Sequence, residues 1–151
     1  MNEANSALDR RTKTVLGIDD SGEMQMILQA TICAVGYNYV GARTGADAMA
    51  RISGPQRFDV ILLDVQLPDT DGFQLCTKIR TQANARKVPV IFLTVRNTVA
   101  DVKNCTAAGG DAFIVKPFNA KTLIRYLDHW STREAGAAGV PDKATATATG
   151  R

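Results

Sequence analysis

Five polar side chains stand directly after short apolar runs, and together they have the chemistry of a cation and phosphoryl site. Asp19 and Asp20 follow one run, and Asp64, Thr94 and Lys116 each follow another. Three carboxylates that lie together repel one another, and a hard divalent cation relieves that repulsion. Oxygen ligands suit Mg²⁺, whereas the absence of His and Cys from these positions disfavours zinc. The set therefore predicts a magnesium site.

The same residues are of the types needed to transfer a phosphoryl group to a carboxylate. Asp64 can attack phosphorus and form an aspartyl phosphate, while the cation draws in the phosphoryl group and shields its charge. Lys116 supplies a point charge for Asp64 before transfer and for a phosphoryl oxygen afterwards. The Thr94 hydroxyl can donate a hydrogen bond to another phosphoryl oxygen.

Each of these residues also has an ordinary structural explanation when it is taken alone. Asp19 and Asp20 could cap a helix, and Asp64 could form a turn at a strand end. Thr94 could be an edge hydroxyl, and Lys116 a solvated lysine. The occurrence of all five residues at four strand ends, in this order, is much less probable by chance than any one of them alone. The functional interpretation is therefore the stronger one.

The elements that must position these residues alternate between two patterns. Short runs that are apolar almost throughout predict strands covered on both faces, and stretches with helical spacing separate them. The runs span residues 15–18, 37–42, 58–63, 88–93 and 112–115, and the helical stretches span 24–32, 46–52, 73–79, 97–108 and 123–130. The run at 37–42 is the weakest and suits an edge strand. Gly36 can end the first helix, and Asp71 and Asn119 can cap the third and the fifth.

Five strand–helix repeats imply parallel strands that are joined by right-handed crossovers. We therefore predict an α/β fold with an open, doubly wound sheet. The carboxyl ends of all its strands lie on one edge, where ligands of open α/β sheets bind. The three carboxylates, the hydroxyl and the ammonium group are thus expected to converge on a single crevice.

Length, composition and charge are those of one ordinary globular domain. The chain has 151 residues, of which 45% are apolar and 22% charged, and its net charge of +3 is too mild to indicate direct nucleic-acid binding. An N-terminus without a signal peptide, and the lack of a membrane-length apolar run, favour a cytoplasmic protein without membrane contact. Cys33, Cys76 and Cys105 are expected to be buried thiols in a reducing compartment.

The two ends of the chain differ in composition from the part between them. Residues 1–12 are polar, and residues 132–151 are rich in Ala, Gly and Thr with almost no large apolar side chain. Such segments bury too little surface to offset their ordering entropy. We predict a flexible N-terminal segment over 1–12 and a flexible tail or linker stub over 132–151. An Ala-rich helical extension is the alternative for the tail.

Four stretches around the polar residues resemble a known family, the receiver domain of two-component response regulators. They are VLGIDDS with the acid pair, DVILLDVQLPDTDGFQLC around Asp64, VIFLTV at Thr94 and GGDAFIVKPF with Lys116. The resemblance covers residues 13–131, which we predict to be the receiver domain. It implies a flavodoxin-like sheet of five parallel strands in the order 2-1-3-4-5 with five helices.

The resemblance also implies a role for each matching acid. Asp64 is the phosphoacceptor, and Asp20 and the backbone carbonyl of Gln66 complete the Mg²⁺ ligands with it. Asp19 acts mainly through a metal-bound water. Thr94 and Lys116 complete the catalytic set around Asp64.

Thr94 and Phe113 match a pair that switches in the family when the phosphoryl group is present. The hydroxyl moves toward the phosphoryl group, and the aromatic ring follows it inward. Plain core packing is the alternative for Phe113, which lacks the hydroxyl that a Tyr would offer. The bond between Lys116 and Pro117 matches one that is cis in the family.

By the same resemblance, the chain is a phosphoacceptor signalling domain and not an enzyme, apart from its own phosphorylation and dephosphorylation. The implied donor is a sensor histidine kinase or a histidine phosphotransfer protein. The face made by the fourth helix, the fifth strand and the fifth helix carries the change to a downstream protein partner. A phosphorylation-dependent homodimer is one form that this step could take.

Other functions stay open at this stage. A constitutive interaction scaffold would keep the fold without being switched, and Val95, where the family often has Ala, would suit it by narrowing the entrance. A Mg²⁺-dependent phosphatase would need a second acid where the chain has Gln66. Gln66 and Arg96 flank the position from which water would attack and could set the phosphoryl lifetime. The chain could also be the receiver portion of a longer regulator.

Overall fold

A five-stranded parallel sheet forms the centre of the protein, for which a computed structural model describes residues 9–95 and 99–133. The strands are β1 (Thr14–Ile18), β2 (Asn38–Ala42), β3 (Val60–Asp64), β4 (Val90–Thr94) and β5 (Ala112–Val115). Their order is β2-β1-β3-β4-β5, and every neighbouring pair is parallel. The predicted doubly wound, flavodoxin-like α/β fold is therefore confirmed.

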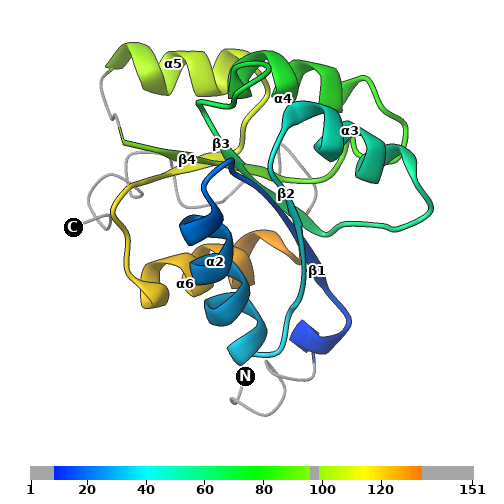
Figure 1. Cartoon of the computed structure of the whole chain (residues 1–151), viewed down its shortest axis with the longest axis vertical. Coiled ribbons are helices and arrows are strands. Elements are labelled where there is room, and N and C mark those ends of the chain that lie inside the picture. The colour runs from blue at the N-terminus through cyan, green and yellow to red at the C-terminus, as the bar shows by residue number, and fades with distance from the viewer. Residues whose placement is uncertain (1–8, 96–98, 134–151) are drawn as a thin grey trace.

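One helix follows each strand within the described part of the chain. These helices are α2 (Gly22–Ala34), α3 (Gly45–Ser53), α4 (Gly72–Arg80), α5 (Val99–Ala107) and α6 (Ala120–Trp130). Helices α2 and α6 cover one face of the sheet, and α3, α4 and α5 cover the other (Figure 1). None of the helices in the described ranges is long and apolar enough to cross a membrane.

Short polar side chains cap α2, α3, α4 and α6, as the sequence predicted for two of these helices. Asp71 and Asn119 cap α4 and α6, each accepting a hydrogen bond from a backbone N–H of the first turn. The cap of α2 is Ser21 and not one of the preceding acids, which leaves both carboxylates available at the sheet edge. Gly36 follows α2 with a φ of 112°, the left-handed conformation expected for a helix stop.

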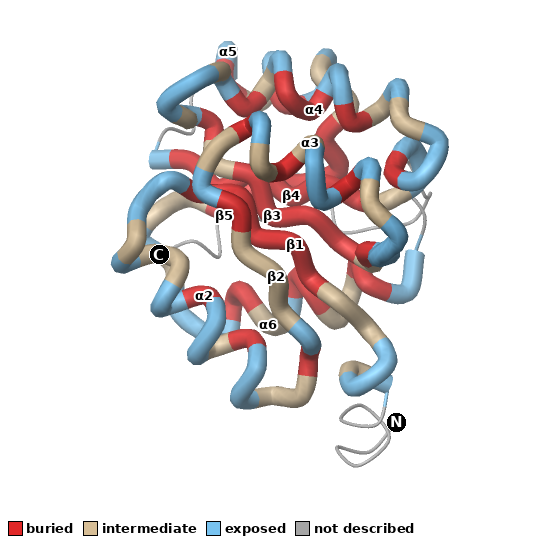
Figure 2. The backbone as a smooth tube through the Cα atoms, turned by 45° about the vertical axis from the view of Figure 1, so that its right-hand side comes forward, coloured by how far each residue is buried: buried red, intermediate tan, exposed pale blue. Residues whose placement is uncertain are grey.

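The core lies along the inner strands, where burial is nearly complete (Figure 2). Every residue of β4 is buried, and so is every residue of β3 except Asp64 at its carboxyl end. Strand β2 is only half-buried, in agreement with its prediction as an edge strand. The buried core therefore extends to the strand ends at which the polar site residues lie.

Two strands begin two residues later than the apolar runs indicated. β3 begins at Val60 because Asp59 uses its carboxylate to accept a hydrogen bond from the backbone N–H of Thr14, at 2.8 Å. β4 begins at Val90 because the preceding Pro89 has no N–H to donate to a ladder. Apolar side chains thus continue into the connections before both strands.

The expectation that all three cysteines are buried was wrong for one of them. Cys76 and Cys105 are buried, whereas Cys33 is exposed on α2. Burial raises the pKa of the Cys76 thiol to about 11, so this thiol stays protonated. The apolar residues of helix α2 point to several sides, and its sequence therefore does not fix which face meets the sheet.

Several predictions concern residues outside the described ranges, namely the first eight residues, Arg96, and the tail from residue 134 onward. Residues 9–11 form a helical turn before β1. The domain boundaries at residues 12 and 132 stay predictions.

Candidate functional site

Three carboxylates meet at the carboxyl edge of the sheet, as the positions of the strand ends predicted. One oxygen each of Asp19, Asp20 and Asp64 lies within 4.8 Å of the others. Asp19 and Asp20 follow β1, and Asp64 ends the neighbouring strand β3. Two adjacent strand ends therefore place all three acids around one small volume.

The loop after β1 holds its two acids in different surroundings. Asp19 is 1% exposed, and its Oδ1 accepts a hydrogen bond from the Ser21 backbone N–H at 2.9 Å. Asp20 is exposed, and Arg43 binds its backbone carbonyl oxygen through two N–H groups. The Asp20 carboxylate therefore faces solvent while its backbone is held.

The loop after β3 is closed into a tight turn beneath Asp64. The Gly72 N–H donates to the Val65 carbonyl oxygen at 2.6 Å, and Gln66 pairs with Asp71 in an isolated antiparallel bridge. A Cβ at position 72 would collide with the Asp64 carbonyl oxygen, so this close approach requires glycine. The turn fixes the backbone of Gln66 next to the acids.

Asp69 anchors this loop to the first residues of α3, the helix that precedes β3, and the sequence did not indicate this contact. Its two carboxylate oxygens accept hydrogen bonds from the backbone N–H groups of Gly45 and Ala46, at 2.8 and 3.0 Å. These bonds lower the pKa of Asp69 below its ordinary value. The DTDG segment that contains Asp69 reads as a turn, but its partner lies 24 residues earlier and is visible only in the fold.

Lys116 directly follows β5 and reaches across to two of the acids. Its Nζ donates to Asp19 Oδ2 at 2.8 Å and lies 3.6 Å from Asp64 Oδ1. The sequence predicted the pair with Asp64, and the structure adds the closer pair with Asp19. The bond from Lys116 to Pro117 is cis, as the resemblance implied.

Three carboxylates that share one ammonium group leave Asp64 short of positive charge. Burial raises the pKa of Asp64, the charge of Lys116 opposes this effect, and the charge of Asp19 adds to it, so that the pKa lies above its ordinary value. A cation at the shared volume would relieve this repulsion. The three side chains that meet here offer carboxylate oxygens, which fits Mg²⁺.

Thr94 and Phe113 lie on the same face of the sheet, on neighbouring strands. Thr94 is paired with Val115, and Phe113 with Phe92, so each residue is two positions from the partner of the other. Phe113 is 1% exposed. A cavity of about 100 Å³ beside Thr94 is lined by Asp64, Val65, Gln66, Thr94, Val95 and Lys116.

The sequence pattern described as response regulator receiver domain matches residues 15–128. The chain belongs to this family. A receiver domain is a signalling phosphoacceptor rather than a catalytic enzyme, and it implies a histidine kinase as a partner.

Solved structures of receivers have the same fold. The chemotaxis protein CheY4 of Vibrio cholerae is 31% identical with a TM-score of 0.75, over 78% of this chain and 98% of that one. The receiver domain of a sensor histidine kinase from Pseudomonas aeruginosa PAO1 is 33% identical with a TM-score of 0.73, over 80% and 98% of the two chains. That structure has a magnesium ion coordinated in its active site cleft.

Curated relatives are longer than this receiver. A probable transcriptional regulator, ycf27, of Guillardia theta is 35% identical over 117 residues, which are 77% of this chain and 44% of that protein. The transcriptional regulatory protein AfsQ1 of Streptomyces coelicolor is 34% identical over 110 residues, 73% and 47% of the two chains. The receiver spans about half the length of the curated relatives it matches.

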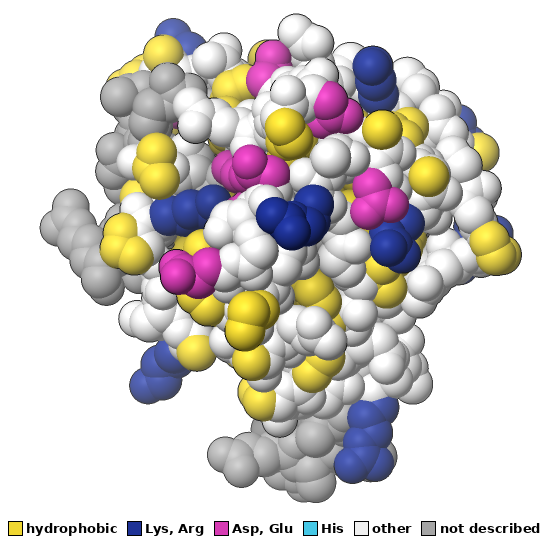
Figure 3. Space-filling view, in the orientation of Figure 1, with side chains coloured by type: hydrophobic (Ala, Val, Ile, Leu, Met, Phe, Trp, Pro, Cys, Tyr) yellow, Lys and Arg dark blue, Asp and Glu magenta, His cyan; other side chains and the backbone are white. Residues whose placement is uncertain are grey.

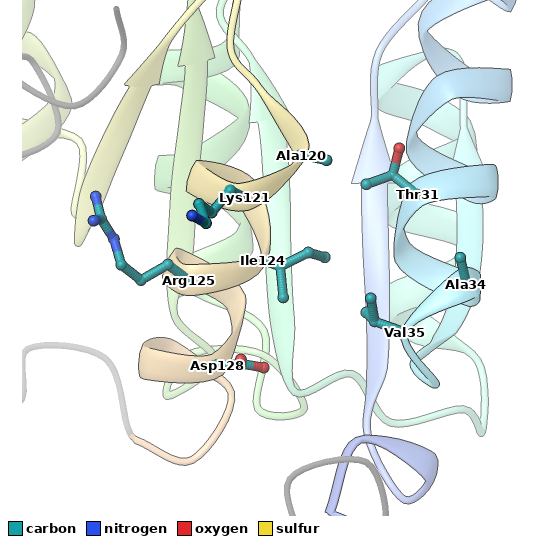
Figure 4. Close-up of a pocket in the computed structure, with 8 residues that line it drawn as sticks. All are labelled: Thr31, Ala34, Val35, Ala120, Lys121, Ile124, Arg125 and Asp128. Atoms are coloured by element: carbon teal, nitrogen blue, oxygen red, sulfur yellow. The ribbon is translucent and has the colours of Figure 1, made fainter. Parts of the chain in front are cut away.

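A second hollow of the receiver lies away from the acids, between α2 and α6. This open groove of about 830 Å³ is lined on one side by Thr31, Ala34 and Val35 and on the other by residues of α6 that include Ile124 (Figure 4). Apolar side chains gather beside it over α2, where Met26 is 74% exposed (Figure 3).

Proposed function

We propose that Asp64 accepts a phosphoryl group from a phosphohistidine of a sensor histidine kinase or a histidine phosphotransfer protein, with Mg²⁺ bound. The observation that carries this proposal is the meeting of Asp19, Asp20 and Asp64 within 4.8 Å, with Lys116 beside them. The partly buried Asp64 ends a strand and borders a small cavity that opens at the sheet edge.

The transfer conserves atoms and charge without a further reactant. An Asp64 carboxylate oxygen attacks phosphorus and forms a new O–P bond as the P–N bond to the donor imidazole breaks. The electron pair of that bond leaves with the imidazole nitrogen. The histidine donor is thereby freed, and Asp64 becomes an acyl phosphate that water later hydrolyses.

The ligands proposed for Mg²⁺ are the carboxylates of Asp20 and Asp64 and the backbone carbonyl of Gln66, with Asp19 acting through water. When bound, the ion neutralises phosphoryl and carboxylate charge. Asp19 also holds the ammonium group of Lys116 at 2.8 Å. Lys116 is thereby kept within reach of Asp64 and of a phosphoryl oxygen on it.

The proposed switch couples Thr94 to Phe113 along one face of the sheet. Thr94 lines the cavity next to Asp64, so its hydroxyl can turn toward a phosphoryl oxygen that arrives there. Phe113 lies inward of Thr94 on the neighbouring strand. A change at this pair would alter the face made by α5, β5 and α6 and thereby the binding of a downstream protein.

A second candidate is that this receiver is the regulatory portion of a longer regulator. The observation that favours it is the length of the curated relatives, of which the matched region is 44% and 47% in two transcriptional regulators. The full-length transcript tests this candidate. An open reading frame that continues into an output domain would support it.

Intact mass spectrometry tests the leading proposal. The protein is incubated with acetyl phosphate and MgCl₂, beside Asp64→Ala and a control, Asp47→Ala, that removes a half-exposed carboxylate on α3. We expect a gain of one phosphoryl group in the wild type and the control, and none without Mg²⁺ or in Asp64→Ala. If acetyl phosphate and a panel of phosphorylated histidine donors all fail, the scaffold function becomes the better explanation.

A further inference from the structure

A polar side chain of α2 binds the backbone on which the acid pair stands. Gln25 Nε2 donates to the carbonyl oxygens of Gly17 and Asp19, both at 3.0 Å, and to that of Ala42 at 3.1 Å. These carbonyls lie at the carboxyl ends of β1 and β2. One amide thus ties together the two strand ends next to Asp19 and Asp20.

Tyr39 on β2 fixes the orientation of that amide. Its hydroxyl donates to Gln25 Oε1 at 2.6 Å, which leaves the amide nitrogen facing the three carbonyl oxygens. The opposite orientation would place an amide oxygen against three acceptors and leave the tyrosine hydroxyl facing an NH₂ group. Tyr39 and Gln25 therefore work as one hydrogen-bonded unit.

The sheet leaves room for this unit at two glycines that face each other. Gly17 of β1 is paired with Gly41 of β2. A Cβ at Gly17 would collide with the Tyr39 ring and hydroxyl, and a Cβ at Gly41 would collide with Gln25 Oε1. The side chains of Tyr39 and Gln25 thus occupy the space that side chains at positions 17 and 41 would fill.

A role in packing alone does not require this chemistry. Helix α2 already packs on the sheet through Leu28 and Ile32, both fully buried. The amide instead donates to carbonyl oxygens at the start of the acid loop. At the same place, the Asp19 N–H donates to the Ala42 carbonyl oxygen at 3.0 Å. Groups that orient metal ligands from behind tune metal affinity strongly.

We propose that Gln25 and Tyr39 are positioning residues that hold the backbone of Asp19 and Asp20 in the arrangement that binds a divalent cation. This inference rests on the proposed function for the identity of the cation. The unit acts through the acid loop and touches neither the cation nor the phosphoryl group.

The test compares two tyrosines whose hydroxyls lie at opposite ends of the sheet. Gln25→Met and Tyr39→Phe remove the unit, while Tyr37→Phe removes a hydroxyl that donates to Asp128 at 2.6 Å, far from the acids. ¹⁵N-labelled proteins are titrated with MgCl₂ and followed by amide chemical shifts. We expect Gln25→Met to weaken Mg²⁺ binding by about tenfold. Tyr39→Phe should weaken it less, and Tyr37→Phe should leave it unchanged.

Phosphorylation by acetyl phosphate separates positioning from a direct role in the reaction. In Gln25→Met the rate should return to the wild-type value at saturating MgCl₂, because only the affinity for the ion is reduced. A Mg²⁺ affinity within twofold of the wild type in both Gln25→Met and Tyr39→Phe would overturn the proposal, even if both variants were less stable.

Amide hydrogen exchange makes the result independent of the proposed function. We expect faster exchange at residues 19–21 in Gln25→Met and Tyr39→Phe than in the wild type and Tyr37→Phe. If the wild type itself binds no Mg²⁺, the proposed function fails. Faster exchange in the variants would then still support the role of Gln25 and Tyr39 in positioning residues 19–21. Unchanged exchange would overturn that role as well.

Discussion

Carboxylates are clustered at one edge of the sheet and separately hydrogen-bonded at the other. At the carboxyl edge, Asp19, Asp20 and Asp64 lie together, and the ammonium group of Lys116 pairs with Asp19 and Asp64. At the amino edge, three aspartates are spread out, and each has its own donors. They are Asp59 with the Thr14 N–H, Asp111 with Arg80 and the Val90 N–H, and Asp128 with Arg10 and Tyr37.

The pKa shifts of Asp64 and Asp128 follow this difference between the two edges. Burial and the neighbouring charge of Asp19 keep the pKa of Asp64 above its ordinary value, although Lys116 opposes them. Burial alone would also raise the pKa of Asp128, but hydrogen bonds from Arg10 and Tyr37 outweigh it and lower that pKa. The amino edge is therefore built for stability, and the carboxyl edge retains repulsion that a ligand can relieve.

The largest expected effect is the loss of stability in Asp111→Ala at the amino edge. Asp111 is 5% exposed, and its Oδ2 accepts hydrogen bonds from Arg80 Nη2 and the Val90 N–H, both at 2.9 Å. Removal of one partner of a buried ion pair leaves the other uncompensated, so the free energy of unfolding should fall by about 3 kcal/mol. Urea unfolding measures this loss, and Asp47→Ala, which removes a half-exposed carboxylate, is the control.

Phosphorylation of the folded fraction of Asp111→Ala should match the wild type, because Asp111 lies at the edge opposite the acids. A loss below about 1 kcal/mol would mean that the pair with Arg80 behaves like an exposed one. The contrast between the two edges would then not hold.

Asp20→Asn should give the reverse result at the carboxyl edge. Mg²⁺ affinity should fall by about 10- to 100-fold, as expected when a group that tunes or binds the metal is lost. Without Mg²⁺ the variant should be at least as stable as the wild type, because one of three mutually repelling carboxylates is gone. Calorimetric titration with MgCl₂ and thermal unfolding in EDTA measure the two quantities. A metal-free variant less stable than the wild type would contradict the idea of retained repulsion.

Asp128→Asn should lower stability in a pH-dependent way. Because folding lowers the pKa of Asp128 below its ordinary value of 3.8, its stabilising effect is present above about pH 4 and is lost as the pH falls through the folded value. The difference in unfolding free energy from the wild type should therefore be largest near pH 7, at less than about 1 kcal/mol, and vanish near pH 2. Urea unfolding at a series of pH values measures it.

Asp64→Asn should change the free energy of unfolding in the opposite direction in the same experiment. Folding raises the pKa of Asp64, so its ionised form destabilises the fold at neutral pH, and its replacement should increase stability there. If both variants changed the free energy of unfolding in the same direction at neutral pH, the ionised carboxylates of the two edges would not differ in their effect on stability.

The fold was predictable because its signals are local. The three inner strands β1, β3 and β4 and the edge strand β5 lie within nearly continuous apolar runs, and Asp71 and Asn119 are capping residues directly before their helices. Since parallel strands end on one edge, the position of Asp64 at the end of its run was enough to bring it to the other acids. The strand order itself came from the resemblance and not from the pattern.

What the sequence did not indicate depends on contacts between distant segments. Arg10 and Asp128 are separated by 118 residues, and no periodicity links them. Gln25 looks like an ordinary polar residue of a helix until β2 brings Tyr39 beside it. The exposure of Cys33 depends on the rotation of a helix whose apolar residues point to several sides, and only packing decides that rotation.

Val95→Ala should produce the smallest effect and concerns access to the carboxyl edge. Val95 is 68% exposed and lines the cavity beside Asp64, so a shorter side chain widens the path of a small phosphodonor. Phosphorylation by acetyl phosphate should become about threefold faster, a change of well under 1.4 kcal/mol in the barrier, with unchanged Mg²⁺ affinity. The matched control is Val99→Ala, since Val99 is 72% exposed on α5 and does not line this cavity. An equal acceleration in both variants, or none in Val95→Ala, would show that Val95 does not limit entry and that the edge is already open to its donor.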